Sequence, residues 1–386
     1  MSEKRKDSKG RVLKTGESQR KDGIYQYRYK DNDNVRRTIY AGTLQELRNK
    51  EKEIEQYLSK GISYYSGSVK LRDAIEKLFS LKRKWKDSTR HTMQMYLKTL
   101  ETRKIYNMPI NKIKVVDCKE LFTELYDEGY SFGSISSIRT ILKMTFDMAC
   151  ENDVLAKNPC SFPLKDVIDD NTPDVVALTE EQEKSLLNFL QTDTIGKRYY
   201  NTFVILLGTG MRISEYAALT KKDIDFDNNC IHVNKQITKA VGELKVTSPK
   251  SKNAYRDIPM TNAVRWCVMS LINNRDPLVK EVMIDGHVGF LNVTRSGRPR
   301  CHSEYADNFR KVMERYNKQA DIKIERCTPH VLRHTFCTKC IAQKMDVKTV
   351  QYLMGHSDAS ITLNIYADEV SENIQRDMTK LVVHCG

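Results

Sequence analysis

A proline-containing stretch near the middle of the chain places the strongest constraint on its fold. Residues 156–177 contain Pro159, Pro163 and Pro173 and lack helical periodicity. Proline has no backbone N–H and breaks helices, so a stretch of this kind connects domains and forms no core. The 386 residues are enough for two or three domains. We therefore predict a linker over residues 161–177, followed by a domain over residues 178–386.

The composition argues against a membrane protein and against a secreted one. No run approaches the roughly 18 to 20 consecutive apolar residues of a membrane-spanning helix. The amino terminus has no apolar segment that could serve as a signal peptide. The ten cysteines are scattered and do not form the dense framework of a small secreted domain, so we expect free thiols. The expected location is the cytoplasm.

The charge balance indicates a polyanionic partner. The chain has 64 Lys and Arg against 50 Asp and Glu, and its isoelectric point is about 9.1. An excess of this size favours nucleic acid as the partner. The first 60 residues carry 16 basic and 10 acidic side chains, so this segment is a basic module in itself.

Residues 1–62 are predicted to form a small sheet backed by one helix. Residues 24–30 alternate strictly between tyrosines and polar side chains, as a half-buried strand requires. A second strand is expected over residues 35–40 and a third over residues 11–14. The Thr-x-x-Glu pattern that begins at Thr43 is a capping box and opens a helix that runs to about residue 60.

The basic face of this sheet is a candidate DNA-binding surface, because a sheet can enter the major groove. A solvated sheet face is the alternative. The candidate contacts are Arg28, Lys30, Arg36 and Arg37.

Residues 63–160 are predicted to form a helical domain. Four segments have apolar residues at helical spacing, which indicates four amphipathic helices. Their apolar positions start at Leu71, Met93, Leu121 and Ile135, and the helices are expected to begin at caps such as Ser88.

The domain from residue 178 is predicted to be mainly helical with a small antiparallel sheet. Thr179 caps its first helix, and an apolar helix around residues 203–207 breaks at Gly208-Thr209-Gly210. Strand signals run from residue 230 to 260, and further helices follow. The fold class is thus multidomain α+β.

Several common chemistries lack their sequence motifs. The chain has no phosphate-binding loop, no Gly-x-Gly-x-x-Gly, no His-Glu-x-x-His and no Gly-x-Ser-x-Gly. Cations, histidines and a tyrosine stand out instead in the last 175 residues. They are Arg212 in GTGMRISE, Lys252 in PKSKNAYRDIP, His330 and Arg333 in TPHVLRHTF, His356 in LMGHSD and Tyr366 in NIYAD.

His330 and Arg333 are three residues apart at the start of a predicted helix, so they project from one face and could hold one anion. Arginine forks suit a phosphodiester, whose transition state spreads charge over two non-bridging oxygens. Each residue taken alone also has an ordinary structural explanation, such as a surface cation or a core tyrosine.

A zinc site is a competing interpretation of one cluster, which consists of Cys327, His330, His334, Cys337 and Cys340. Zinc fingers pair two separated ligand doublets around a loop. Here apolar residues are interleaved with the candidate ligands, which favours a single core helix. We therefore expect no metal ligands in this segment.

The ordered set Arg212, Lys252, His330-x-x-Arg333, His356 and Tyr366 resembles the catalytic set of the tyrosine recombinase (phage integrase) family. TGMRISEYAALT is similar to the family's first-arginine box, and YLMGHSDASITLNIYAD to its second-histidine and tyrosine box. The segment GRVLKTGESQRKDGIYQYRYKD resembles the arm-type DNA-binding domain of conjugative-transposon integrases. The resemblance covers the whole chain. It implies an arm-binding domain over residues 1–62, a core-binding domain over 63–160 and a catalytic domain over 178–386.

The resemblance also implies a mechanism. Tyr366 attacks the scissile phosphate and forms a 3′-phosphotyrosine. Arg212, Arg333 and His356 stabilise the phosphate, while His330 moves the tyrosine's proton. Lys252 protonates the leaving 5′-oxygen, although Lys250 and Lys245 lie nearby in the sequence and Lys250 is the alternative.

The bond energy is kept in the phosphotyrosine, so the resemblance implies neither a metal nor another cofactor. The implied partners are double-stranded DNA with core and arm sites, a homotetramer on a Holliday junction, an excisionase and a host DNA-bending protein. A carboxy-terminal segment, residues 371–384, is the candidate for docking onto a neighbouring protomer, with folding back onto its own protomer as the alternative. The competing functions are relaxation of DNA by a type IB topoisomerase and a non-catalytic architectural role.

Overall fold

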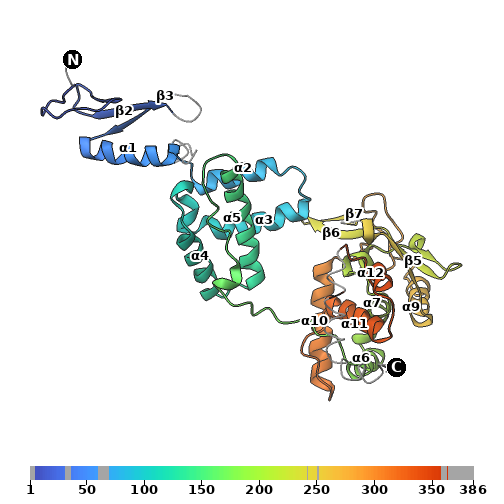
Figure 1. Ribbon diagram of the computed structural model, residues 1–386. Coiled ribbons are helices and arrows are strands. Elements are labelled where there is room, and N and C mark those ends of the chain that lie inside the picture. The colour runs from blue at the N-terminus through green and yellow to red at the C-terminus, as the bar shows by residue number, and fades with distance from the viewer. Residues whose placement is uncertain are drawn as a thin grey trace, which may run out of the picture. The chain divides into compact units, whose positions relative to one another are not determined.

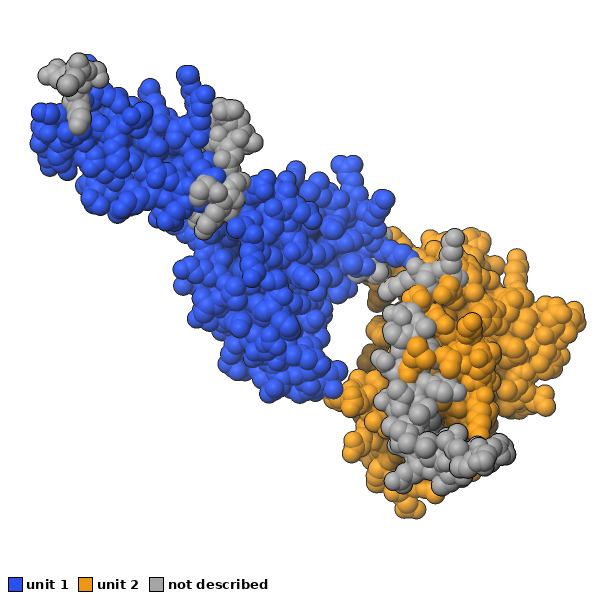
Figure 2. Space-filling model, in the orientation of Figure 1, with its two compact units in different colours: residues 1–172 blue, residues 173–386 orange. Residues whose placement is uncertain are grey.

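The computed structural model divides the chain into two compact units, residues 1–172 and 173–386 (Figures 1 and 2). None of the helices in the described part of the chain is long and apolar enough to cross a membrane. The residues that the structure describes are 5–30, 36–59, 69–240, 242–249, 252–357 and Leu363.

The first unit begins with a three-stranded antiparallel sheet covered by one helix, as the sequence predicts (Figure 1). Tyr25 and Ala41 on the sheet pack against Leu44 and Leu47 of the helix. The strand order is β1-β2-β3, and Tyr25 pairs with Ala41 at one end of the β2–β3 ladder. The elements are β1 (Glu17–Gln19), β2 (Tyr25–Lys30), β3 (Arg36–Ala41) and α1 (Leu44–Ser59).

The expected third strand over residues 11–14 is wrong, because β1 lies at residues 17–19. Asp7 accepts hydrogen bonds from the backbone N–H groups of Lys9 and Arg11 and from the Arg11 side chain. These bonds fold residues 7–11 into a turn, and Val12 makes only an isolated bridge to Lys6. A short polar side chain here competes with the strand ladder for the backbone donors.

Two carboxyl groups are buried together between β1 and α1. Glu17 is fully buried and accepts from Arg48 at 2.9 Å and 3.1 Å. Glu51 is also buried, and its Oε1 has no hydrogen-bond partner among the described residues. Burial and the neighbouring Glu17 raise the pKa of Glu51 to about 7. Burial alone would raise the pKa of Glu17 as well, but the hydrogen bonds from Arg48, the Lys14 backbone N–H and the Glu51 carboxyl together outweigh burial, and the pKa is lowered.

We predict that Glu51→Gln stabilises this module, and more so above neutral pH. The folded module holds a proton on Glu51 up to about pH 7, whereas the unfolded chain releases it near the ordinary value of 4.5. The free energy of unfolding of the wild type therefore falls as pH rises through this window and is flat above it. Glutamine has no proton to lose, so at about pH 8 the variant should gain about 1 to 3 kcal/mol.

Urea unfolding of the full chain at about pH 5 and pH 8, followed through the tyrosines of the module, would measure this gain. Glu53→Gln, on the exposed face of α1, is the matched control and should change stability equally little at both pH values. A Glu51→Gln gain that is the same at both pH values would contradict the prediction.

The second part of the first unit is the predicted four-helix domain. α5 supplies the centre of its core, where Ile138, Ile141, Leu142 and Phe146 are fully buried. Cys160, Leu164 and Ile168 belong to the same core, so the chain packs on these helices until at least residue 168. The elements are α2 (Leu71–Leu81), α3 (Asp87–Glu101), η2 (Lys104–Asn107), η3 (Ile110–Lys112), α4 (Val115–Asp127), α5 (Phe132–Glu151) and η4 (Leu164–Asp166).

The second unit is mainly helical, as predicted, with one small antiparallel sheet and a separate hairpin. Thr179 caps its first helix by accepting from the Gln182 N–H. The apolar helix α7 packs against α9 and α11, and its Phe203 stacks on Phe309 of α10 at 4.1 Å. The helices are α6 (Glu180–Thr192), η5 (Gly196–Arg198), α7 (Tyr200–Thr209), α8 (Ile213–Ala218), η6 (Lys221–Asp223), η7 (Lys252–Ala254), α9 (Asn262–Asn273), α10 (His302–Gln319), α11 (Pro329–Ala342) and α12 (Val347–Met354).

The strands of this unit lie between α8 and α9 in the sequence. The sheet has the order β4-β5-β8, and β6 pairs with β7 as the hairpin. Their bounds are β4 (Ile224–Asp225), β5 (Cys230–Val233), β6 (Gln236–Ala240), β7 (Glu243–Thr247) and β8 (Arg256–Pro259).

Candidate active site

The structure describes the side chains of four of the six predicted catalytic residues. Three of these four make short contacts to the same loops. Arg212, Arg333 and His356 meet around the carboxyl ends of α7 and α12. His330 lies in the first turn of α11, three residues before Arg333. The backbone of Lys252 lies in η7, and Tyr366 lies outside the described residues.

Arg212 lies where α7 ends and α8 begins. Gly210 ends α7 in the left-handed conformation, with φ of 61°, and Arg212 is the N-cap of α8. Its guanidinium donates to Glu215 Oε1 at 2.8 Å and to the Gly355 carbonyl at 3.1 Å. The side chain is 40% exposed, so part of its fork faces solvent and is available to a ligand.

Glycine is required at position 210 because two helices approach it closely. A Cβ atom there would overlap the Phe336 ring and lie 3.0 Å from the Met354 sulfur. A side chain would also be strained at this φ. The bare backbone therefore lets α11 and α12 close on the end of α7, which brings Arg333 to the Gly210 carbonyl.

Arg333 is held from two sides by backbone oxygens. One Nη donates to the Gly210 carbonyl at 2.6 Å and the other to the Met354 carbonyl. The residue is 3% exposed. Burial, followed by the charge of Arg212, lowers the pKa of Arg333 to about 9, so it stays cationic at neutral pH. Arginine has five N–H donors, and the bonds that Arg333 makes to other described residues use two of them, which leaves three for an anion.

Arg256 is a third arginine in this cluster, and sequence reasoning missed its role. Its side chain is fully buried and donates to Glu215 Oε2 at 2.8 Å, to the Leu353 carbonyl at 2.6 Å and to the Ala254 carbonyl at 3.0 Å. The sequence does carry a signal for it. Strand alternation places Arg256 on the same face as the apolar Ile258, and a cation there must find buried partners.

Glu215 connects two of these arginines. It is 2% exposed and bonds Arg212 with one oxygen and Arg256 with the other. Burial would raise the pKa of Glu215, but Arg256 and Arg212 outweigh it and the pKa is lowered. Three guanidinium groups against one carboxylate leave a surplus of positive charge, which suits an anionic ligand.

The two histidines are held in their neutral form. Burial and the charges of Arg333 and Arg212 lower the pKa of His330, although its side chain reaches the surface. The same causes, with Arg256 in addition, lower the pKa of the buried His356 to about 4. A neutral imidazole can accept a proton at one nitrogen and donate a hydrogen bond from the other.

The turn that carries Lys252 contacts the loop of His356. Asn253 donates to the His356 carbonyl at 3.5 Å. Gly355 makes this contact possible, because a Cβ there would lie 3.0 Å from Arg256 Nη1 and 3.2 Å from the Asn253 carbonyl. The structure therefore brings the backbone of residue 252 near the cluster. Lys250, the alternative, lies outside the described residues.

The cysteines of the competing zinc interpretation are core residues. Cys337 and Cys340 are buried in a cluster with Ile341, Val350 and Met354. They belong to the single helix α11, as expected.

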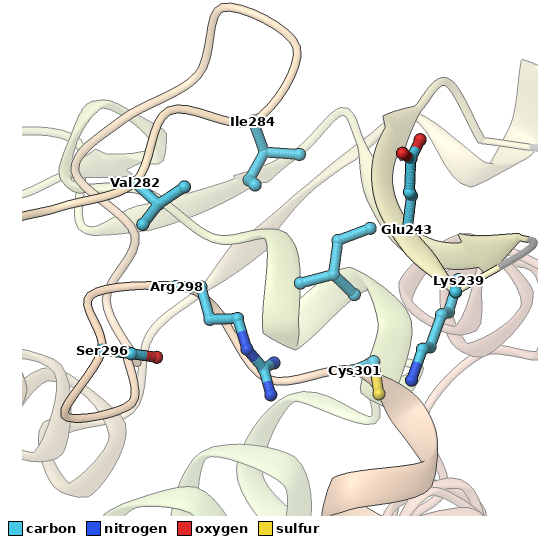
Figure 3. Close-up of a pocket in the computed structure, with 9 residues that line it drawn as sticks. Lys239, Glu243, Val282, Ile284, Ser296, Arg298 and Cys301 are labelled. Carbon is cyan, nitrogen blue, oxygen red and sulfur yellow. The ribbon is translucent and has the colours of Figure 1, made fainter.

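A cavity of about 550 Å³ in the second unit contains none of the predicted catalytic residues. Lys239, Arg298 and Cys301 lie around it, with Val282 and Ile284 as apolar walls (Figure 3). Arg298 is already paired with Glu304 at 2.6 Å. The arginine cluster, in which Arg212 is partly exposed and Arg256, Arg333 and Glu215 are buried, shares no residue with the lining of this cavity.

The predicted arm-domain contacts gather at the open end of the β2–β3 ladder. A hollow of about 480 Å³ is lined by Arg28, Tyr29, Lys30, Arg36, Arg37 and Thr38. Lys30 pairs directly with Arg36, so strand alternation places these two and Arg28 on one face. Arg37 pairs with the buried Tyr29 and projects from the opposite face.

Known proteins share both the sequence patterns and this fold. A profile of the phage integrase family matches residues 177–372, and one of the DNA binding domain of tn916 integrase matches residues 1–58. The transposase from transposon Tn916 of Enterococcus faecalis is 34% identical over 396 residues, which cover 99% of this chain and 97% of that protein. The transposase from transposon Tn1545 of Streptococcus pneumoniae is 35% identical with the same coverage.

The integrase of transposon Tn1549, solved in complex with a circular intermediate DNA, superposes with a TM-score of 0.76 at 35% identity. That match covers 80% of this chain and 99% of the solved one. A lambda integrase tetramer bound to a Holliday junction gives a TM-score of 0.54 at 15% identity over 90% of this chain and 97% of that one, which is a likeness of fold alone. The chain belongs to the phage integrase family of tyrosine recombinases.

Proposed function

We propose that this protein is a site-specific DNA recombinase that integrates and excises a mobile element of the conjugative-transposon class, acting on DNA in the cytoplasm. The arginine cluster carries the proposal. Arg333 is fixed by two backbone carbonyls and Arg212 by Glu215 and Gly355, and neither uses all of its N–H donors on the described part of the chain. Two fixed arginine forks match the two non-bridging oxygens of a phosphodiester.

Tyr366 is the proposed nucleophile. It attacks the phosphorus, the bond to the 5′-oxygen breaks, and a 3′-phosphotyrosine and a free 5′-hydroxyl result. His330, which its lowered pKa keeps neutral, accepts the tyrosine's proton. The neutral His356 donates a hydrogen bond to a non-bridging oxygen. Attack of a 5′-hydroxyl from the partner duplex reverses the same step and completes strand exchange.

Lys252 is the proposed acid that protonates the leaving 5′-oxygen, with Lys250 as the alternative. Lys252→Ala should slow cleavage by about 100-fold, because a general acid contributes at least this much. A DNA substrate with sulfur in place of the bridging 5′-oxygen needs no protonation, so the variant should cleave it at nearly the wild-type rate. Single-turnover cleavage of both substrates measures this rescue.

Lys250→Ala is the matched comparison. If Lys252 is the acid, the Lys250→Ala variant should cleave both substrates at nearly the wild-type rate. Rescue of Lys250→Ala and not of Lys252→Ala would assign the role to Lys250, and the absence of rescue in both would contradict a lysine acid in this turn.

The proposed assembly is a homotetramer that joins two DNA duplexes through a Holliday junction. The lambda integrase tetramer of similar fold was solved on such a junction, and the Tn1549 integrase was solved with transposon right end DNA. The basic face around Arg28, Lys30 and Arg36 is proposed to hold arm sites. An excisionase and a DNA-bending protein are the proposed accessory partners.

A recombination assay tests the function. Two duplexes that carry the attachment sites of the element, one of them labelled, are incubated with the protein, and exchanged products are separated by length. The proposal expects products of a new length that require both sites. Relaxation of supercoiled DNA without any site, and no exchange, would indicate a type IB topoisomerase. Binding without cleavage would indicate an architectural protein.

A further inference from the structure

Four potential metal ligands share the outer face of the sheet β4-β5-β8. The strand register places Asp225 opposite Cys230 and His232 opposite Asp257. The alternate residues Ile231, Val233 and Ile258 are buried in the core of the second unit. Because successive side chains of a strand point to opposite faces, the four polar residues lie together on the solvent side.

Three of these residues converge on one point. One ligand atom from each of Asp225, Cys230 and His232 lies within 4.8 Å of the others. His232 Nε2 is 3.8 Å from Asp225 Oδ2. One nitrogen, one oxygen and one sulfur ligand form the kind of mixed set that zinc accepts, and zinc needs only small movements of rotatable side chains to draw them to bonding distance.

The orientation of His232 supports a ligand role. Its Nδ1 is 2.6 Å from Asp257 Oδ1, which leaves Nε2 directed towards Asp225 and Cys230. A carboxylate behind the histidine fixes the tautomer that presents a lone pair at Nε2. In protein zinc sites the other ring nitrogen of a ligating histidine usually donates to a carboxylate, a backbone carbonyl or a water, and Asp257 supplies the first of these here.

Asp225 retains a free coordination position. Its Oδ1 accepts from the backbone N–H groups of Asp227 and Asn228, and its Oδ2 accepts from the Asn228 amide. A carboxylate offers about four lone-pair positions, so one remains on the oxygen that faces His232. The turn bonds also hold the carboxylate in place before any ion arrives.

We propose that Asp225, Cys230 and His232 bind a zinc ion on the outer face of this sheet, with Asp257 as the residue that orients His232. The ion has three protein ligands and a water molecule, and binding converts the Cys230 thiol to a thiolate with release of its proton. The site is distinct from the arginine cluster and takes no part in cleavage.

The ion would stabilise the sheet that carries Arg256. Its ligands come from β4 and β5, and the hydrogen bond between His232 and Asp257 connects them to β8, one residue from Arg256. An ion that binds the folded chain and not the unfolded one raises the melting temperature in proportion to the logarithm of its concentration. The inference does not depend on the proposed recombinase function.

Zinc binding to the metal-free full-length protein tests the proposal, measured by competition with a chromophoric chelator. We expect one ion per chain, with cobalt giving the thiolate charge-transfer band of a cysteine-bound ion. Cys230→Ala and His232→Gln should abolish this binding, and Asp257→Asn should weaken it by about 10- to 100-fold. Cys150→Ala and His91→Gln, which remove a thiol and an imidazole from the first unit, are matched controls and should bind as the wild type does.

A second measurement needs no substitution. Zinc should slow the alkylation of Cys230 in the wild-type protein at least tenfold, as followed by mass spectrometry of the Cys230 peptide, and should leave that of Cys150 unchanged. Absence of stoichiometric zinc binding, or zinc binding that survives both Cys230→Ala and His232→Gln, would overturn the proposal. DNA cleavage that persists in chelator would be consistent with it, and cleavage that requires zinc would contradict the separation of the two sites.

Discussion

Arg333→Lys should slow strand cleavage by about 1,000-fold while DNA binding stays close to that of the wild type. Arg333 donates two N–H groups to the carbonyls of Gly210 and Met354, and its contacts with the described residues leave three for the phosphate. Lysine keeps the charge but has one compact donor group, so it cannot satisfy two carbonyls and a phosphate together. The substitution should therefore weaken the stabilisation of the transition state and leave the binding of DNA nearly unchanged.

Single-turnover cleavage of labelled attachment-site DNA, with a gel-shift measurement of affinity, separates the two effects. Arg326→Lys is the control, because Arg326 is exposed in the loop before α11 and nearby in sequence. It should cleave at the wild-type rate. An Arg333→Lys variant that is folded, binds DNA and cleaves within tenfold of the wild type would contradict the role given to this arginine.

Glu215→Gln should lower the free energy of unfolding of the second unit by about 3 to 5 kcal/mol. The substitution keeps the size of the side chain but removes the charge that two arginines share. Arg256, whose side chain is fully buried, would then be an uncompensated cation in the core. Removing one partner of a buried ion pair costs this much because the other charge can neither pair nor reach water.

Denaturant unfolding of the full chain measures the loss, with the second unit followed through Trp266 of α9. Glu183→Gln is the matched control. Glu183 pairs with the partly exposed Lys339, so this substitution should lower the free energy of unfolding by less than about 1 kcal/mol. In the double variant Glu215→Gln with Arg256→Met, the second change should recover part of the loss, since no buried cation remains. If Glu215→Gln lowers the free energy of unfolding no more than the control does, the Glu215 carboxylate does not stabilise the arginine cluster.

Local signals in the sequence were sufficient to predict most of the helices and strands, because caps, breakers and periodicity act over a few residues. Thr179 caps α6, and Gly210 ends α7, where the sequence places them. The third strand of the first sheet was misplaced because Asp7 draws the backbone of residues 9 and 11 into a turn. A competing side-chain bond of this kind is not visible in hydrophobic alternation.

The convergence of the site could not be derived from periodicity. Arg212, Arg256 and Arg333 are far apart in the sequence, and they meet because the carboxyl ends of α7 and α12, at Gly210 and Gly355, come together beside α11. The family resemblance named Arg212 and Arg333 by their motifs. It did not name Arg256, whose burial depends on the register of β8 with β5 and on Glu215 lying within reach.

The most direct test of the central claim is to trap the covalent intermediate on a nicked attachment-site duplex, in EDTA and without ATP, and to compare the wild type with Tyr366→Phe on a denaturing gel. Cleavage next to the nick releases a short fragment that diffuses away, so the intermediate accumulates. The account predicts a covalent protein–DNA band from the wild type, with the DNA linked through its 3′-phosphate to the peptide that contains Tyr366, and no band from the variant. Equal bands from both proteins, or no band from wild-type protein that is shown to bind the DNA, would contradict it.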